Sequence, residues 1–353
     1  MLAFRALHNI DLTRNLVASK QIPPDFAAFT NDYLAFAREN ETSKRYTAVD
    51  TNTQVLSCVC QILQIALSNE EPTDHTRTAL EELAKSIAMR LFRTEIDAQE
   101  KIAHMNKFIK KGSLVQALVM DDTDDNVYLY IVAKVEHSEW FDGESLQKSF
   151  GFPTEKKNVW KSAVIPLTIS EDEIHFGSIR IYTDNEARYW SKEFLEVVEE
   201  KSDETNTKTA FEAIDRVLRL ELKKEHPRDY YVLRNTVIQA MKTPQLLDYN
   251  DYIESLLGGY VPEDRCVNTT FLKSKLLQLP EKKKFDTQFT TVPKAIVAHK
   301  KLKFEPTDGI VINVDGSLDD YKEVITACVD DQHRRVLMIR CSNPDTFKAF
   351  GGN

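Results

Sequence analysis

Apolar and polar positions in the first half of the chain follow the periods of both strands and helices. Alternation with period two, rich in β-branched and aromatic residues, predicts strands that pair into an antiparallel sheet. The predicted strands span residues 2–10, 114–120, 127–135, 162–169 and 173–182. Apolar residues at three-to-four spacing predict helices in the same half. These span residues 26–37, a segment that opens at Thr51 or Asn52, and residues 78–92 and 95–109.

After residue 186 the pattern becomes mainly helical and ends in a small β-unit. The predicted helices span residues 187–198, 207–224, 228–241, 252–257 and 269–279, and the predicted strands span 309–314, 321–330 and 335–341. The last two strands face each other as a hairpin, and a short helix follows Asn343-Pro344. A single core seldom grows past roughly 250 to 300 residues, so this chain predicts two domains. We expect an α+β fold, with an antiparallel sheet and helices in 1–186 and a helical domain with a terminal hairpin in 187–353.

Apolar runs and cysteines narrow the class of protein. The longest apolar runs, 55–67 and 113–120, are shorter than the roughly 20 residues that span a bilayer. The N-terminus has no export signal pattern, so we expect a cytoplasmic protein. Five scattered cysteines do not form a disulfide framework. Cys58 and Cys60 stand within an apolar helical pattern, which predicts a buried structural role.

Charge is distributed unevenly along the chain. The net charge of −9 argues against unspecific polyanion binding. Residues 273–303 nevertheless carry nine lysines against Glu281 and Asp286, a local charge of +7 that leaves −16 for the remainder. The lysines are Lys273, Lys275, Lys282, Lys283, Lys284, Lys294, Lys300, Lys301 and Lys303. Lysines neutralise phosphates, and aromatic side chains stack on bases or sugars. The aromatic candidates are Phe285, Phe289, His299 and Phe304. From the charge run alone, we favour a solvated lysine surface with these aromatics in the core over a nucleic-acid-binding surface.

Catalytic and metal-binding patterns are weak throughout. No G-x-G-x-x-G or P-loop spacing occurs, and no G-x-S-x-G string marks a nucleophile. The aspartates at 121, 122, 124 and 125 lack the glycine and distal glutamate of an EF-hand, which favours a solvated hairpin tip. Asp215, Glu221 and Lys223 are the nearest nuclease-like group, but their helical pattern favours a salt-bridged face. We therefore expect no enzyme, no cofactor and no bound metal.

Five short segments follow one another along the chain: ALHNI, VYLYIVAKV, ARYWSKEFLEVV, GIVINVDGS and the ending GGN. Their order and approximate spacing resemble those of bacterial nucleoid-associated proteins of about 37 kDa. The resemblance implies a cytoplasmic homodimer, located at the nucleoid, that binds DNA without enzymatic activity. Relatives of this kind also occur beside phage-defence genes, which implies a second setting in antiviral defence. The cysteines, residues 142–158 and the basic segment have no counterpart in that family.

Charge and resemblance lead to one hypothesis and two alternatives. We expect binding of double-stranded DNA mainly through backbone phosphates, with little base readout. The contacts are assigned to Lys282, Lys283, Lys284, Lys300, Lys301 and Lys303. In the first alternative, acidic clusters at 121–125 and 193–204 recruit a DNA-processing protein, including in anti-phage defence. A metal-dependent nuclease is the less favoured alternative.

Overall fold

The structure is a computed structural model of the chain. It describes residues 2–22, 42–68, 73–105, 108–109, 111–121, 124, 126–136, 138–141, 148–151, 159–171, 173–184, 187–299, 301–315 and 324–351. Contacts divide the chain into two compact units. The first unit is Met1–Ser202 with Leu246–Tyr252 and Lys284–Thr290, and the second is Asp203–Gln245 with Ile253–Lys283 and Thr291–Asn353. The predicted helix 26–37 lies outside the described residues.

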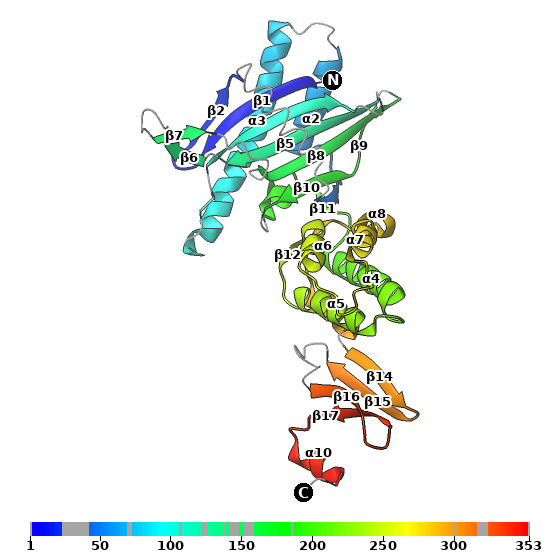
Figure 1. Ribbon diagram of the computed structural model, residues 1–353. Helices are drawn as coiled ribbons and strands as arrows, with labels where there is room; N and C mark the ends of the chain where they lie inside the picture. Colours follow the sequence, from blue (N-terminus) through cyan, green and yellow to red (C-terminus); the bar gives the residue numbers. More distant parts are fainter. Residues whose placement is uncertain are drawn as a thin grey trace. The chain divides into compact units, whose positions relative to one another are not determined.

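An antiparallel sheet forms the centre of the first unit (Figure 1). Its described strands are β1 (Leu2–Asp11), β2 (Leu16–Lys20), β3 (Lys44–Thr47), β4 (Gly112–Met120), β5 (Val127–Glu136), β8 (Val159–Ser170), β9 (Glu173–Phe176), β10 (Ile179–Thr183) and β11 (Val198–Glu199). The order is β11-β3-β10-β8-β5-β4-β1-β2, and β9 also pairs with β8. A separate hairpin joins β6 (Ser138–Phe141) and β7 (Lys148–Gly151). The predicted α+β class and the β4–β5 hairpin are confirmed.

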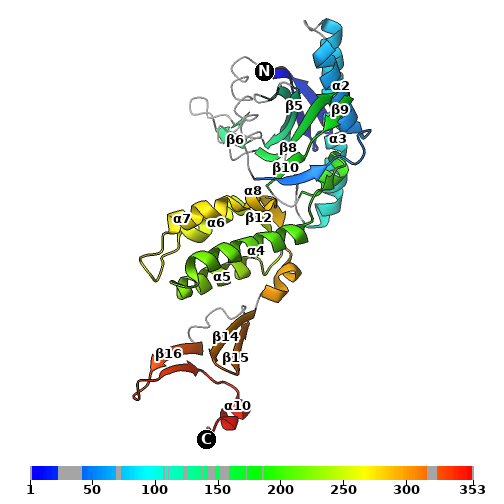
Figure 2. The ribbon, with the colours of Figure 1, turned by 90° about the vertical axis from the view of Figure 1, so that its right-hand side faces the viewer.

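Two helices cover one face of this sheet, α2 (Gln54–Ser68) and α3 (Asp74–Ile102) (Figure 2). Their apolar stripes bury Ile62 and Leu91 against sheet residues such as Leu118 and Tyr130. Each large apolar side chain buried in this way stabilises the fold by roughly 1.5 to 3 kcal/mol. The other face of the sheet also buries apolar residues, including Ile131 on β5.

Three local predictions were wrong. Residues 78–92 and 95–109 were predicted as two helices, but α3 is continuous through 93–94 because neither glycine nor proline interrupts it. The predicted strand 173–182 divides into β9 and β10 around Gly177, whose N–H donates to the Pro166 carbonyl at 2.9 Å. The predicted helix 187–198 is only a π-helical turn, Trp190–Phe194, followed by β11. Its apolar residues are buried by the sheet and helices around them.

The first unit also contains two short segments from the second half of the sequence. Strand β12 (Leu246–Asp248) pairs with β13 (Gln288–Thr290). The Arg45 Nε donates to Asp286 Oδ1 at 3.0 Å, so this buried carboxylate is neutralised by β3. Gln288 Nε2 donates to the Thr183 carbonyl at 2.8 Å on β10. These contacts fix residues 284–290 against the edge of the large sheet.

The second unit is mainly helical and ends in two hairpins. Its helical elements are α4 (Asp203–Leu222), α5 (Pro227–Ala240), α6 (Tyr249–Gly258, of which the first residues belong to the first unit), α7 (Thr269–Leu277), α8 (Leu279–Lys283) and the 3-10 turn η4 (Pro293–His299). Helix α4 contacts α5, α7, α8 and η4 through buried residues such as Phe211 and Leu218. The hairpins are β14 (Lys301–Thr307) with β15 (Ile310–Asp315) and β16 (Ile325–Val329) with β17 (Arg335–Ile339). Helix α10 (Pro344–Ala349) follows, as predicted.

Candidate functional site

The lysine-rich segment begins on two consecutive helices. Asn268 caps α7 by accepting a hydrogen bond from the Phe271 N–H at 2.9 Å. Helix α8 follows and is anchored by Leu279 and Pro280, both buried. It ends at Lys283, and the next residue, Lys284, has a φ of 57°, the left-handed conformation that often terminates a helix. The basic side chains of 282–284 therefore project from a backbone that is fixed on both sides.

Among the described residues, Lys273, Lys275 and Lys294 are engaged in ion pairs. Lys273 pairs with Glu254, Lys275 Nζ lies 2.7 Å from Glu221 Oε1, and Lys294 Nζ lies 2.9 Å from Glu204 Oε2. The acidic partners stand on α4 and α6. Ion pairs this exposed contribute little to stability, about 0 to 1 kcal/mol each. They do neutralise the charge that these three lysines would offer to phosphate.

Lys282 and Lys283 are exposed and have no carboxylate partner among the described residues. Lys282 Nζ donates to the neutral amide oxygen of Gln278 at 2.6 Å. Lys283 is exposed beside it at the end of α8, and Lys284 is exposed as well. The segment has two acidic residues. Asp286 is buried and paired with Arg45, and Glu281 lies on α8. Residues 282–284 are thus the most concentrated positive charge of the segment.

The remaining predicted lysines lie at the start of β14. Lys303 is exposed there. Lys301 begins β14 opposite Asp315 in the register of the hairpin, and its side chain lies outside the described part. Lys300 also lies outside the described residues.

The predicted aromatic contacts are mostly buried. Phe285 and Phe289 are 1% exposed and belong to the core of the first unit. The ring of Phe304 lies 5.0 Å from that of Tyr231, centroid to centroid, in the second unit. The side chain of His299 lies outside the described set. Stacking of bases on Phe285 or Phe289 is therefore excluded by their burial.

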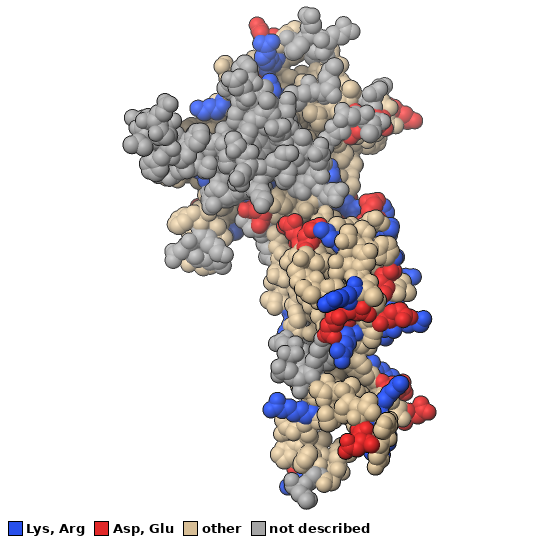
Figure 3. Space-filling model, in the orientation of Figure 1, with Lys and Arg blue, Asp and Glu red and all other residues tan. Residues whose placement is uncertain are grey.

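Charge on the visible face of the second unit is mixed. Lys and Arg side chains lie beside Asp and Glu side chains over its helices (Figure 3). The lysine-rich segment is divided between the two units, because Lys284 belongs to the first and Lys273 to Lys283 and Lys294 onward belong to the second. The described lysines therefore do not all belong to one unit.

The two carboxylates of the nuclease-like group, Asp215 and Glu221, contact side chains of other residues. Asp215 Oδ1 accepts hydrogen bonds from Tyr230 Oη at 3.0 Å and Arg234 Nε at 2.8 Å. Glu221 pairs with Lys275. Of the aspartates at 121–125, those at 122 and 125 lie outside the described residues. The residues that the structure describes contain no cluster of three or more metal-binding side chains.

A buried charged cluster in the first unit was missed by the sequence analysis. Lys134 on β5 and Lys161 on β8 are paired in register, and Lys134 Nζ lies 2.5 Å from Oε1 of fully buried Glu95 on α3. Tyr189 Oη donates to the same oxygen at 3.2 Å, and Lys161 Nζ lies 3.6 Å from Asp184. Burial lowers the pKa of Lys161, and the Asp184 charge opposes that shift. The cluster is charge-balanced, and Glu95, Lys134 and Lys161 are buried while Asp184 is exposed at its margin. We therefore assign the Glu95–Lys134 pair a structural role.

His8 occupies a second buried polar position, under α3. Its Nδ1 lies 3.3 Å from Gln116 Nε2, which also donates to the Ala84 carbonyl at 2.9 Å. Tyr130 Oη donates to Gln116 Oε1 at 2.9 Å. Burial lowers the pKa of His8 to about 4, with a further contribution from the Lys85 charge. The imidazole is therefore neutral near pH 7 and acts as part of the core.

Comparisons with known proteins add no assignment. The sequence matches no protein-family model, and no significant match was found among curated proteins or among solved structures. Among the described helices, none is long and apolar enough to cross a membrane. The function is therefore argued from the lysine groups and their surroundings.

Proposed function

We propose that the chain binds duplex DNA through its backbone phosphates, without turnover, and that residues 282–284 are the principal contact. Lys300, Lys301 and Lys303 form the second group of contacts. The observation that carries this proposal is the exposed run at the end of α8, where Lys282 and Lys283 have no described carboxylate partner. Nucleoid location and a setting in antiviral defence follow from the family resemblance and belong to the same proposal.

The physical basis is counterion release. A lysine that neutralises a phosphate frees a condensed counterion, so affinity falls with salt, with a log–log slope of about −0.9 for each phosphate neutralised. The rest of the chain is acidic and repels DNA. Binding is therefore expected to depend on a few local groups and to weaken steeply as salt rises. Little sequence preference is expected, because phosphate contacts position a protein but do not read bases.

Two charge-matched triple variants test this assignment. Lys282→Gln/Lys283→Gln/Lys284→Gln removes the run at the end of α8, and Lys273→Gln/Lys275→Gln/Lys294→Gln removes the same charge from the ion-paired positions. The first variant is expected to reduce the salt slope for duplex binding by about 3, because three phosphate contacts are lost. The second is expected to keep the wild-type slope. Fluorescence anisotropy of a labelled mixed-sequence duplex measures both.

Equal loss in the two variants would show that only net charge matters and would remove the specific role of residues 282–284. Unchanged binding in the first variant would overturn the assignment outright. No binding by the wild-type chain at low salt would favour recruitment of a protein by the acidic surface. Far-UV circular dichroism of each variant confirms that the helices remain folded.

A further inference from the structure

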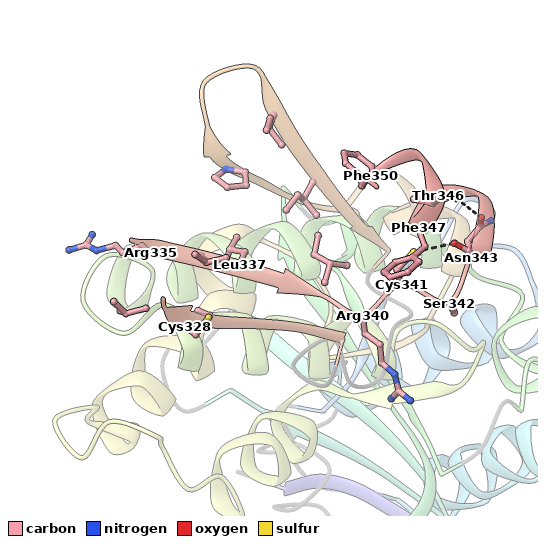
Figure 4. Close-up of a pocket in the computed structure, with 17 residues that line it drawn as sticks. Cys328, Arg335, Leu337, Arg340, Cys341, Ser342, Asn343, Thr346, Phe347 and Phe350 are labelled. Atoms are coloured by element: carbon pink, nitrogen blue, oxygen red, sulfur yellow. Dashed lines mark hydrogen bonds between the residues drawn. The ribbon is translucent and has the colours of Figure 1, made fainter. Parts of the chain in front are cut away.

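The end of the second unit exposes an apolar groove. It lies between the hairpins β14–β15 and β16–β17 and helix α10, and its volume is about 1390 Å³ (Figure 4). Leu337 and Phe347 lie along it, while the guanidinium groups of Arg335 and Arg340 point away. The surface inside the groove is therefore apolar. A charged ligand would find no cation directed toward it from either arginine.

The apolar side chains that line this groove are largely uncovered. In the described chain, α10 buries none of its side chains. The exposed fractions of six large apolar side chains are 54% for Ile310, 65% for Val329, 42% for Leu337, 50% for Ile339, 51% for Phe347 and 90% for Phe350. A hairpin of two strands is at best marginally stable alone in water, so both hairpins require a covering surface.

The exposed area matches what a stable dimer buries. A large apolar residue exposes about 200 Å², so these six at somewhat over half exposure leave on the order of 700 Å² accessible. Monomeric proteins rarely expose a contiguous apolar patch beyond about 300 to 600 Å². A standard interface buries about 800 Å² on each partner.

The shape and charge of the patch favour a second copy of this chain as the occupant. A two-fold interface must be self-complementary, because the same surface meets itself. Here one surface carries both a groove and projecting phenylalanines, so Phe350 of each copy can occupy the groove of the other. Residues 301–353 carry seven basic and nine acidic residues, a net charge of −2. Long-range repulsion between two such ends is therefore small.

We infer that the hairpins β14–β15 and β16–β17, together with α10, form a two-fold self-association surface. In the dimer, the apolar side chains of one groove are buried against those of the partner's groove. They then form a single apolar core to which each chain contributes half. This inference does not rest on DNA binding, because no described lysine lines the groove, although Lys301 and Lys303 stand on β14.

Sedimentation of the full chain without DNA tests the inference. Protomer concentrations run from about 1 to about 100 μM, since oligomer populations depend on concentration. A reductant is present because Cys266 and Cys341 are exposed. The wild-type chain is expected to be dimeric, and Leu337→Asp/Phe350→Asp is expected to raise the dimer Kd by at least about 100-fold, as for loss of interface hot spots. The control Leu220→Asp/Val261→Asp changes two residues that are 68% and 84% exposed outside the groove and is expected to dimerise as wild type.

The variant Phe350→Ala separates weaker dimerisation from unfolding of the hairpins. Its side chain is almost wholly exposed in the monomer, so its removal is not expected to unfold them. It is expected to weaken the dimer by about 10-fold or more, in the range for truncation of an interface aromatic. A wild-type chain that stays monomeric to the highest concentration would overturn the inference. So would a dimer that neither groove variant weakens. The Lys282→Gln/Lys283→Gln/Lys284→Gln variant is expected to dimerise normally, so failure of the DNA proposal and failure of the dimer are distinguishable.

Discussion

Strands β5 and β17 each contain three consecutive large apolar residues, and their surroundings differ completely. On β5, Leu129, Tyr130 and Ile131 are at most 6% exposed, whereas Leu337, Met338 and Ile339 on β17 are 42%, 53% and 50% exposed. Strand β5 has β4 and β8 on its two edges, and the helix-covered face of the sheet lies under α2 and α3. Strand β17 has one described neighbour, β16.

The difference shows that the pattern of apolar residues predicts a strand but does not predict which element packs over its apolar face. Alternating and β-branched residues favour extended backbone in both places. In the first unit, helices from the same chain bury the apolar face. At the C-terminal hairpins that cover is absent from the described part of the chain. The first region is a core, and the second is an exposed apolar surface.

The largest expected effect concerns the buried ion pair between Glu95 on α3 and Lys134 on β5. Glu95→Ala leaves Lys134 without its carboxylate partner in a solvent-free position. Breaking a buried ion pair in this way costs about 3 to 5 kcal/mol. Urea unfolding followed by tryptophan fluorescence measures the loss in the first unit, because all three tryptophans of the chain belong to it. A loss below about 1 kcal/mol, the typical value for exposed pairs, would show that the cluster is solvated.

A matched pair of leucines compares core and interface directly. Leu118→Ala on β4 is expected to cost about 2 to 5 kcal/mol, since Leu118 is fully buried and leaves a cavity. Leu337→Ala is expected to leave tryptophan-detected unfolding within about 0.5 kcal/mol of wild type, as for surface substitutions. The same variant is expected to weaken the dimer. Equal losses for the two variants in the unfolding measurement would contradict the distinction between the regions.

The last expected effect appears only at acid pH and concerns His8. Its pKa is about 4 in the folded chain and 6.5 when exposed, so the unfolded state binds more protons between these values. Stability is therefore lost as pH falls from 6.5 toward 4, by on the order of 3 kcal/mol for a shift of this size. His8→Leu removes that contribution, and urea midpoints of wild type and variant are compared across this range. Parallel pH profiles would show that folding does not lower the pKa of His8.

Much of the secondary structure was predictable because its signals are local. The pattern over 2–10, 114–120 and 127–135 predicts β1, β4 and β5 to within a residue or two at most ends. Strands β3 and β11 were missed, since four and two residues are too few to show a period. Their places in the sheet depend on pairing with distant strands. The addition of 284–290 to the first unit has the same non-local origin.

The sequence predicted that lysines are concentrated in the lysine-rich segment. It did not predict which of them pair with acidic side chains in the fold. Glu254 and Glu221, which neutralise Lys273 and Lys275, lie 19 and 54 residues away in sequence, so the charge run alone concealed them. The buried cluster did leave a signal. Tyr130 and Val132 face the helices, and Lys134 stands two positions further on the same face of β5, where a charge requires a partner.

The most direct test of the account is a salt series of duplex binding by the wild-type chain, with the DNA inspected for cleavage with and without magnesium. Binding through phosphates predicts intact DNA and an affinity that falls by at least about 40-fold between about 50 and about 200 mM salt, as expected for three or more phosphate contacts. Absence of binding at low salt would contradict it. Cleavage that requires magnesium would replace phosphate binding with nuclease chemistry.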